Sequence, residues 1–210
     1  MPSGTSIVLK EGTKGIAGEA FRGCSGLTSV TWNVKNCNNN AYYSLFIGCT
    51  NIKTFEFASE VERIPAYLCD GLTDLTSVTI PNSVTEIGNS AFRDCTGLTR
   101  IEAYPNPEKV STGGNVFYSV PKNETLHVLP KYMSAYRTAS QWRDFTNIKG
   151  DLTENGGDIN LDGKVNVTDV TTLVNMIANG ETANLELVDI NADGKVNVSD
   201  VTALVNIILK

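Results

Sequence analysis

The sequence has few of the residues from which nucleophilic catalytic sites and zinc sites are built. It contains a single histidine, His127, and its five cysteines form no Cys-x-x-Cys pair. Zinc sites need cysteine and histidine clustered at short spacing, so the sequence predicts none. Neither a Ser-His-Asp or Cys-His arrangement nor a glycine-rich phosphate loop is evident. His127 lies in the segment TLHVLP, a predicted strand, where we expect it to be structural.

The sequence also lacks an excess of basic charge and any long apolar run. Its 17 Lys and Arg residues are outnumbered by 23 Asp and Glu residues, which gives a net charge of −6. Phosphate binding needs a basic face, so nucleic acid is not expected as a partner. No apolar run approaches the ~18 residues of a membrane span, so none is expected. The first residues lack the charged and then apolar pattern of a signal peptide.

The acidic residues are concentrated toward the C-terminus. Residues 1–150 hold 14 basic and 13 acidic residues, whereas residues 151–210 hold 3 lysines and 10 acidic residues. A short segment with that much acid either stays disordered through self-repulsion or gathers its carboxylates around cations. The composition changes across GDLTENGG, residues 150–157. We therefore expect a domain boundary there, with residues 151–210 as a separate domain.

Residues 1–130 contain an internal repeat of 23 to 25 residues. The pattern is Phe, then Cys three positions later, Leu three after that, and apolar residues three and five further on; the third copy starts with Cys and Leu, and in the fifth Val replaces Cys and Asn123 interrupts the Leu position. The copies are Phe21, Cys24, Leu27, Val30 and Trp32; Phe46, Cys49, Ile52, Phe55 and Phe57; Cys69, Leu72, Leu75, Val78 and Ile80; Phe92, Cys95, Leu98, Ile101 and Ala103; and Phe117, Val120, Leu126 and Val128. Ile7 and Leu9 fit the strand positions of a further copy, so we expect a fragment that begins within a repeat.

This periodicity predicts a solenoid. Alternating apolar residues in segments such as LTSVT suit a short strand with one buried face, and segments such as AFRGC suit a short helical or turn element. One coil cannot bury its apolar face alone, so coils must stack into a continuous core. The stretch IPNSVTEIGNSAFRDCTGLTRIE resembles the leucine-rich repeats of bacterial BspA-like surface proteins. That resemblance implies a secreted or cell-surface bacterial protein whose repeats, residues 1–130, bind a protein or glycan ligand.

Residues 131–150 are predicted to close the array. The segment KYMSAYRTASQWRDF places Tyr132, Tyr136, Trp142 and Phe145 at spacings that suit an amphipathic helix followed by a docked tail. The end of a solenoid has to be covered, so a cap is favoured over an aromatic ligand platform.

The five cysteines are expected to stay reduced. Cys24, Cys49 and Cys95 occupy one repeat position and Cys69 the adjacent Phe position, whereas Cys37 lies in a predicted polar loop. A buried free cysteine behaves as a small hydrophobic residue, so reduced core cysteines are favoured over disulfides.

Two nearly identical twelve-residue segments lie 31 residues apart: DINLDGKVNVTD at 158–169 and DINADGKVNVSD at 189–200. Each has side-chain oxygens at positions 1, 3, 5, 9 and 12, a glycine at position 6 for a sharp turn, and a lysine whose carbonyl is available at position 7. Calcium takes roughly six to eight oxygens, so these loops predict two calcium ions (Ca²⁺). The predicted ligands are Asp158, Asn160, Asp162, Lys164, Asn166, Asp169, Asp189, Asn191, Asp193, Lys195, Asn197 and Asp200. Aspartate replaces the usual glutamate at position 12, which leaves the preference for calcium over magnesium open.

Each loop is expected to lead into an exiting helix only. The sequence NGG at 155–157 precludes the entering helix of an EF-hand, while apolar residues keep one face after each loop. These residues are Val167, Val170, Leu173, Val174 and Ile177 in the first copy and Val198, Val201, Leu204, Val205 and Ile208 in the second. The duplicated unit resembles a type I dockerin, the module by which secreted bacterial proteins, often polysaccharide-degrading enzymes, bind cohesin domains. The predicted fold is α/β: a leucine-rich-repeat solenoid followed by a small all-α calcium-binding dockerin with two loop–helix repeats.

The resemblance to dockerins also implies a surface for a cohesin-like partner. In that family, loop positions 10 and 11 and the polar face of the following helix contact cohesin. The corresponding residues are Val167, Thr168, Thr172 and Asn175 in the first copy and Val198, Ser199, Thr202 and Asn206 in the second. Family members commonly have a polar residue at position 10, so valine there leaves the choice of cohesin open. The near-identity of the copies predicts a pseudo-twofold module able to present either face.

Two functions are compatible with these features. We favour a non-enzymatic, secreted or cell-surface binding protein, with repeats for ligand recognition or adhesion and a dockerin for attachment to an assembly. The alternative is an accessory or C-terminal fragment of an enzyme of polysaccharide catabolism. A catalytic site within this chain is disfavoured, because glycoside hydrolysis needs two carboxylates across a cleft. The candidates Glu60, Glu62 and Glu102 fall on predicted solenoid turns.

Removal of calcium is predicted to unfold the C-terminal domain alone. Six carboxylates among ten ligand side chains repel one another unless cations hold them together. Excess chelator should therefore lower the helical circular-dichroism signal while the β signal of the repeats stays. An unchanged helical signal would contradict this prediction.

Overall fold

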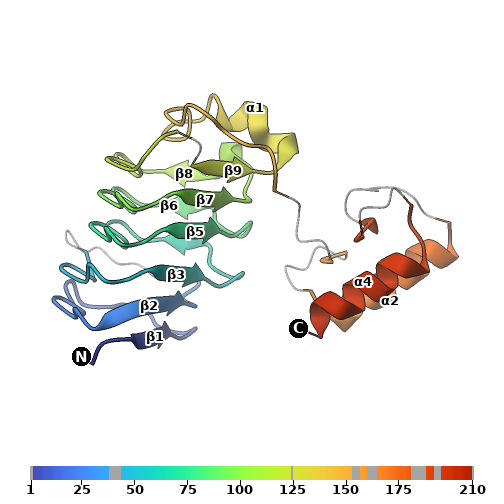
Figure 1. The fold of residues 1–210 in the computed structure, drawn as a ribbon, viewed down its shortest axis with the longest axis horizontal. Helices are drawn as coiled ribbons and strands as arrows, with labels where there is room; N and C mark the ends of the chain where they lie inside the picture. Colours follow the sequence, from blue (N-terminus) through green and yellow to red (C-terminus); the bar gives the residue numbers. More distant parts are fainter. Residues whose placement is uncertain are drawn as a thin grey trace. The chain divides into compact units, whose positions relative to one another are not determined.

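The computed structural model describes residues 2–37, 44–123, 125–152, 157–159, 165–180, 188–191 and 195–209 (Figure 1). The chain divides into two compact units, Met1–Leu152 and Thr153–Lys210. Among the described helices, none is long and apolar enough to cross a membrane.

The first unit is a solenoid of about five turns, built on two parallel sheets. The larger sheet has the order β1-β2-β3-β5-β7-β9, and the smaller has the order β4-β6-β8. The strands are β1 (Thr5–Leu9), β2 (Leu27–Trp32), β3 (Thr54–Phe57), β4 (Arg63–Ile64), β5 (Ser77–Ile80), β6 (Glu86–Ile87), β7 (Arg100–Ala103), β8 (Ser111–Thr112) and β9 (Leu126–Val128). Figure 1 shows the strands of the larger sheet stacked in chain order, one coil upon the next.

The core lies inside the coils, because equivalent residues of successive copies stack in register. Ser29 pairs with Thr54, and Ser77 pairs with Arg100, at separations equal to the sequence repeat. The Leu position of the repeat is fully buried in four successive copies, at Leu27, Ile52, Leu75 and Leu98. The first copies are less well covered: Ile7, Phe21, Cys24 and Phe57 are only partly buried against this core. The predicted solenoid and its core positions are thus confirmed.

The AFRGC and AFRDC segments form turns and not helices. One residue with left-handed backbone lies directly before each segment and another lies within it: Glu19 and Gly23 in one coil, and Ser90 and Asp94 in another, with φ between 55° and 68°. Left-handed residues end a helical turn, which returns the chain to the next strand. Glu102, in contrast, lies in β7 and not in a turn as the sequence suggested.

All five cysteines are free, as predicted. Burial raises the pKa of Cys95 to about 12, and its thiol donates a hydrogen bond to the carbonyl of Cys69 at 2.9 Å. Cys37 lies outside any helix or strand, among polar residues, but its side chain is fully buried. Cys37 follows Val34, also buried, so this segment turns inward despite its polar neighbours.

Aromatic side chains after β9 pack on the last coil. The rings of Trp142 and Phe145 lie 4.8 and 5.3 Å from that of Phe117, which itself stacks on Phe92 at 5.6 Å. The buried hydroxyl of Tyr136 donates to the carbonyl of Pro105 at 2.7 Å.

The described helical elements of the first unit are η1 (Pro107–Lys109), η2 (Pro130–Tyr132) and α1 (Met133–Tyr136). The predicted amphipathic helix is thus only four residues long, and most of the covering is done by turns. The limits 131–150 for a cap stay a prediction.

The second unit has its own small core. Helices α2 (Val167–Ala178) and α4 (Val198–Ile208) contribute Leu173 and Leu204, which pack with Ile159 and Val188. A Cβ at Gly157 would lie 2.7 Å from Leu204 Cδ1, so this core closes against the start of the first loop.

Stacking at van der Waals distance makes some glycines irreplaceable. A Cβ at Gly88 would lie 2.4 Å from the backbone nitrogen of Ala66 in the neighbouring coil, whereas one at Gly114 would meet nothing closer than 4.0 Å. We expect Gly88→Ala to lower the free energy of unfolding by about 2 kcal/mol, since backbone must move. Gly114→Ala should change it by less than about 0.5 kcal/mol. Urea titration followed by circular dichroism checks both, and equal effects would contradict the close approach.

Candidate metal and partner site

The two loop–helix repeats of the second unit share the same helix start. Asn166 and Asn197 are the N-cap residues of α2 and α4, with extended backbone. Their side-chain oxygens accept hydrogen bonds from the backbone nitrogens of Thr168 and Ser199, each at 2.9 Å. Position 9 of each loop therefore caps a helix, which satisfies a backbone donor that the helix itself leaves unpaired.

The aspartates at position 12 are fully buried and complete the cap. Asp169 Oδ2 and Asp200 Oδ2 accept hydrogen bonds from the backbone nitrogens of Asn166 and Asn197, both at 2.8 Å. Asp200 Oδ1 also accepts from the nitrogen of Asn191 at 3.3 Å, which joins positions 3 and 12 of the second loop. These bonds hold each carboxylate against the loop backbone, where the shorter aspartate can reach an ion.

The structure describes eight of the twelve predicted ligands. Asp158 and Asp189, at position 1, are half-buried, and Asn191 and Lys195 are exposed. Asn160, Asp162, Lys164 and Asp193 lie outside the described residues. The described residues alone contain no group of three or more His, Cys, Asp or Glu side chains that could hold a metal. In the second loop the structure brings Asn191, Asn197 and Asp200 together by hydrogen bonds.

The donor set fits a hard cation. Every predicted side-chain ligand carries oxygen, and two of the carboxylates are buried inside a loop, an environment that favours a bound cation. The capping role of Asn166 and Asn197 was missed from the sequence, although Asn-x-x-Asp just before an apolar run is a capping-box pattern.

Comparisons with known proteins agree with both units. The family model described as BspA type Leucine rich repeat region matches residues 3–124 in six copies, more than half of the chain. The chain belongs to the BspA-type leucine-rich-repeat family. A second model, Dockerin type I domain, matches residues 156–209, which makes the second unit a dockerin domain. Both resemblances stated from the sequence are confirmed.

Solved structures of two bacterial repeat proteins are similar to this BspA-type protein. A leucine-rich-repeat protein of T. pallidum shares 20% identity, with 69% of each chain covered and a TM-score of 0.49. One from Bacteroides ovatus shares 23% identity over 69% of this chain and 41% of that chain, with a TM-score of 0.46. A comparison with curated proteins found no match.

These modules support a role in protein interaction for the BspA-type protein. Leucine-rich repeats and dockerins are non-catalytic modules that act in protein interaction, and the dockerin mediates assembly with cohesins. Type I dockerin domains bind calcium. Both modules are typical of extracellular or cell-surface proteins.

The residues expected to contact a partner differ in exposure. Val167 and Val198, at the start of the two dockerin helices, are 69% and 70% exposed. They continue the predicted apolar face of each helix without being buried, and Val174 is also exposed at 45%. Their exposure follows from their position in the first turn, beyond the reach of the small Leu173–Leu204 core.

The polar helix face of the dockerin domain differs from the sequence expectation at one residue. Thr168, Asn175, Ser199, Thr202 and Asn206 are exposed, whereas Thr172 is half-buried. The equivalent of Thr202, 31 residues earlier, is Thr171. Both hydroxyls donate to the carbonyl four residues before, Thr171 to Val167 at 3.1 Å and Thr202 to Val198 at 3.2 Å. The exposed face of the first copy therefore includes Thr171 in place of Thr172.

Removal of one buried carboxylate should remove one ion. Asp200→Asn keeps an acceptor for the backbone nitrogen of Asn197 but loses the charge that a cation needs. We expect titration calorimetry to show the calcium stoichiometry falling from two to one. The exposed Asp74→Asn in the repeat array is the matched control and should keep two. Two ions in the Asp200→Asn variant would contradict the assignment of position 12.

Proposed function

We propose that this chain is a non-enzymatic binding protein of the bacterial cell surface or extracellular space. Its repeat array recognises a protein or glycan ligand, and its dockerin domain attaches it to a cohesin-like partner. The observation that carries this proposal is the joining of a solenoid with a dockerin domain in one chain, because neither module is catalytic.

The dockerin domain is proposed to hold two calcium ions. The ligands are the side chains at positions 1, 3, 5, 9 and 12 of residues 158–169 and 189–200, with the carbonyls of Lys164 and Lys195. Asn166 and Asn197 act through water, since each side-chain oxygen already caps a helix and that of Asn166 also accepts from the Thr168 hydroxyl. Bound calcium would neutralise carboxylates that otherwise repel one another, and so would hold the loops in the form that the partner recognises.

The partner surface is proposed to centre on the exposed valines of the two helix starts. Both valines are exposed, and they occupy the loop position that the dockerin family uses for cohesin contact, which favours a protein contact at both copies. Thr168, Thr171 and Asn175 flank Val167, and Ser199, Thr202 and Asn206 flank Val198. The two copies would offer the same chemistry in two orientations.

Binding to an immobilised panel of recombinant type I cohesins tests this proposal. The full chain should bind a cohesin with calcium and lose binding in excess chelator. Val167→Asp with Val198→Asp together should weaken binding by about tenfold or more, since a buried charge would face the partner. Each single variant should bind nearly as well as the unaltered chain, because the other copy is intact.

The control for this experiment is Val8→Asp, which alters a valine of similar exposure, 57%, in the repeat array. It should leave cohesin binding unchanged. A double variant that binds as tightly as the unaltered chain would contradict the valine surface, and binding that persists in chelator would contradict the calcium dependence.

A further inference from the structure

The exposed face of the larger sheet carries two straight rows of polar side chains. Residues alternate along each strand, so apolar side chains enter the core and their neighbours face outward. The first row is Ser6, Ser29, Thr54, Ser77 and Arg100, and the second is Val8, Thr31, Glu56, Thr79, Glu102 and His127. We call these two rows the polar face. Its order is imposed by the stacking of the coils, not by local sequence.

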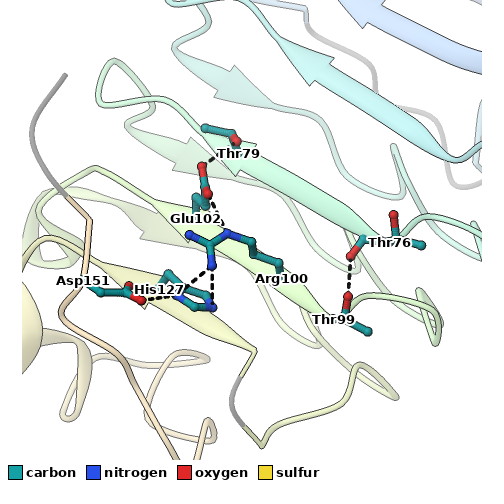
Figure 2. A network of polar contacts seen from close by, with 7 residues as sticks. All are labelled: Thr76, Thr79, Thr99, Arg100, Glu102, His127 and Asp151. Carbon is teal, nitrogen blue, oxygen red and sulfur yellow. Dashed lines mark hydrogen bonds and ion pairs between the residues drawn. The ribbon is translucent and has the colours of Figure 1, made fainter. Parts of the chain in front are cut away.

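The charged and ionisable members of the polar face contact one another at its C-terminal end (Figure 2). Arg100 Nε donates to Glu102 Oε1 at 2.7 Å, and its Nη1 lies 3.2 Å from both ring nitrogens of His127. An Asp151 oxygen lies 2.8 Å from His127 Nδ1, and Thr79 donates to Glu102 Oε2 at 3.2 Å. These polar groups are therefore held in place before any ligand arrives. Glu56 is the remaining charged member of the two rows.

Free hydroxyls occupy the middle of the polar face. Ser29 donates to Ser6 at 2.9 Å, but the hydroxyls of Thr31, Thr54 and Ser77 make no hydrogen bond to the residues that the structure describes. Each hydroxyl both donates and accepts, so it can pair with another hydroxyl in either direction. Neighbouring strands of a sheet lie about 4.8 Å apart, so Thr54 and Ser77, which are adjacent in the first row, lie at about that interval, and Thr31 lies in the second row.

These features favour one class of ligand over the others that the outer face of a sheet could bind. Apart from Val8 on the edge strand, the rows offer no large exposed apolar side chain for a hydrophobic partner to cover. Arg100 is paired with Glu102 and the other carboxylates, Glu56 and Asp151, are acidic, so a polyanion finds no complementary field. A neutral polymer of hydroxyl groups does match both the chemistry and the charge. The strand interval is also close to the length of one sugar ring in an extended glycan, so successive sugars would meet equivalent hydroxyls.

We infer that the polar face binds a neutral, linear polysaccharide whose chain runs across the strands. This inference rests on the proposed function, in which the repeat array recognises an external ligand, and it narrows that ligand to one chemical class. Thr31, Thr54 and Ser77 pair with sugar hydroxyls. The Arg100–Glu102 pair and Asp151 supply fixed polar groups at the end of the binding track.

Affinity electrophoresis of the full chain through gels that contain one polymer each tests this inference. The neutral polymers are a β-1,3-glucan, a xyloglucan, a galactomannan and a dextran; heparin and polygalacturonate are the acidic ones, and gelatin is the polypeptide. At least one neutral polymer should retard the chain, equally with calcium and with chelator, because the predicted calcium ligands lie outside the repeat array.

The test variant is Thr31→Ala, Thr54→Ala and Ser77→Ala in one chain. Loss of three hydroxyls should weaken retention by about tenfold or more. The matched control is Thr50→Ala, Thr73→Ala and Thr96→Ala, which removes three exposed hydroxyls from equivalent positions just before β3, β5 and β7. A second test variant, Thr31→Val with Thr54→Val, removes two of the three hydroxyls and keeps the β-branched shape that strands prefer, so it should also weaken retention, by less than the triple variant.

The outcomes separate this inference from the proposed function. Retention of the chain by gelatin, heparin or polygalacturonate, but by no neutral polymer, overturns the inference. Retention by gelatin would still support a repeat array that binds an external ligand. No retention by any polymer also overturns it, as does equal weakening by the test and control variants. Cohesin binding of the same variants reports the proposed attachment independently and should not change.

Discussion

The contact of each coil with the next is the interaction on which the rest of the repeat array depends. A coil of 23 to 25 residues exposes its apolar face on both sides, and only its neighbours remove that face from water. The contact is close: Gly97 lies so near the coil before it that a Cβ there would meet the Thr73 carbonyl oxygen at 2.2 Å. Residues one sequence repeat apart therefore pair with each other on neighbouring strands of the sheet.

Two consequences follow from this stacking. The terminal coil needs a cover, and the turns that bury Tyr136, Trp142 and Phe145 provide it. The outward side chains are also drawn into straight rows, so that residues 23 or more positions apart in the sequence become neighbours. The network of Arg100, His127 and Asp151 forms in this way, from two strands and the segment that follows them.

The dockerin domain is held together by a different balance. Its core is small, with Leu173 and Leu204 as the fully buried apolar residues of α2 and α4, and its loops are rich in carboxylates. Burial of the Asp169 and Asp200 carboxylates is costly unless donors or cations face them. Backbone N–H groups of the helix caps meet part of that need, and the predicted calcium ions would meet the rest. Folding and metal binding are coupled in such a domain.

Much of this protein could be predicted from its sequence, because the informative features repeat. The positions of Leu27, Ile52, Leu75 and Leu98 and the paired acidic loops are visible as periodic patterns, and periodicity reports which residues share a face. The local sequence pattern did not predict burial where burial depends on contacts with other segments. Cys37 is buried although its neighbours in the sequence are polar, and Val167 is exposed although it continues an apolar helix face. The sequence alone determined the modules, their order and the candidate ligands, since each is a short-range pattern. Only the tertiary structure decided which side chains meet across coils and which helix residues face water, because both depend on contacts between distant segments.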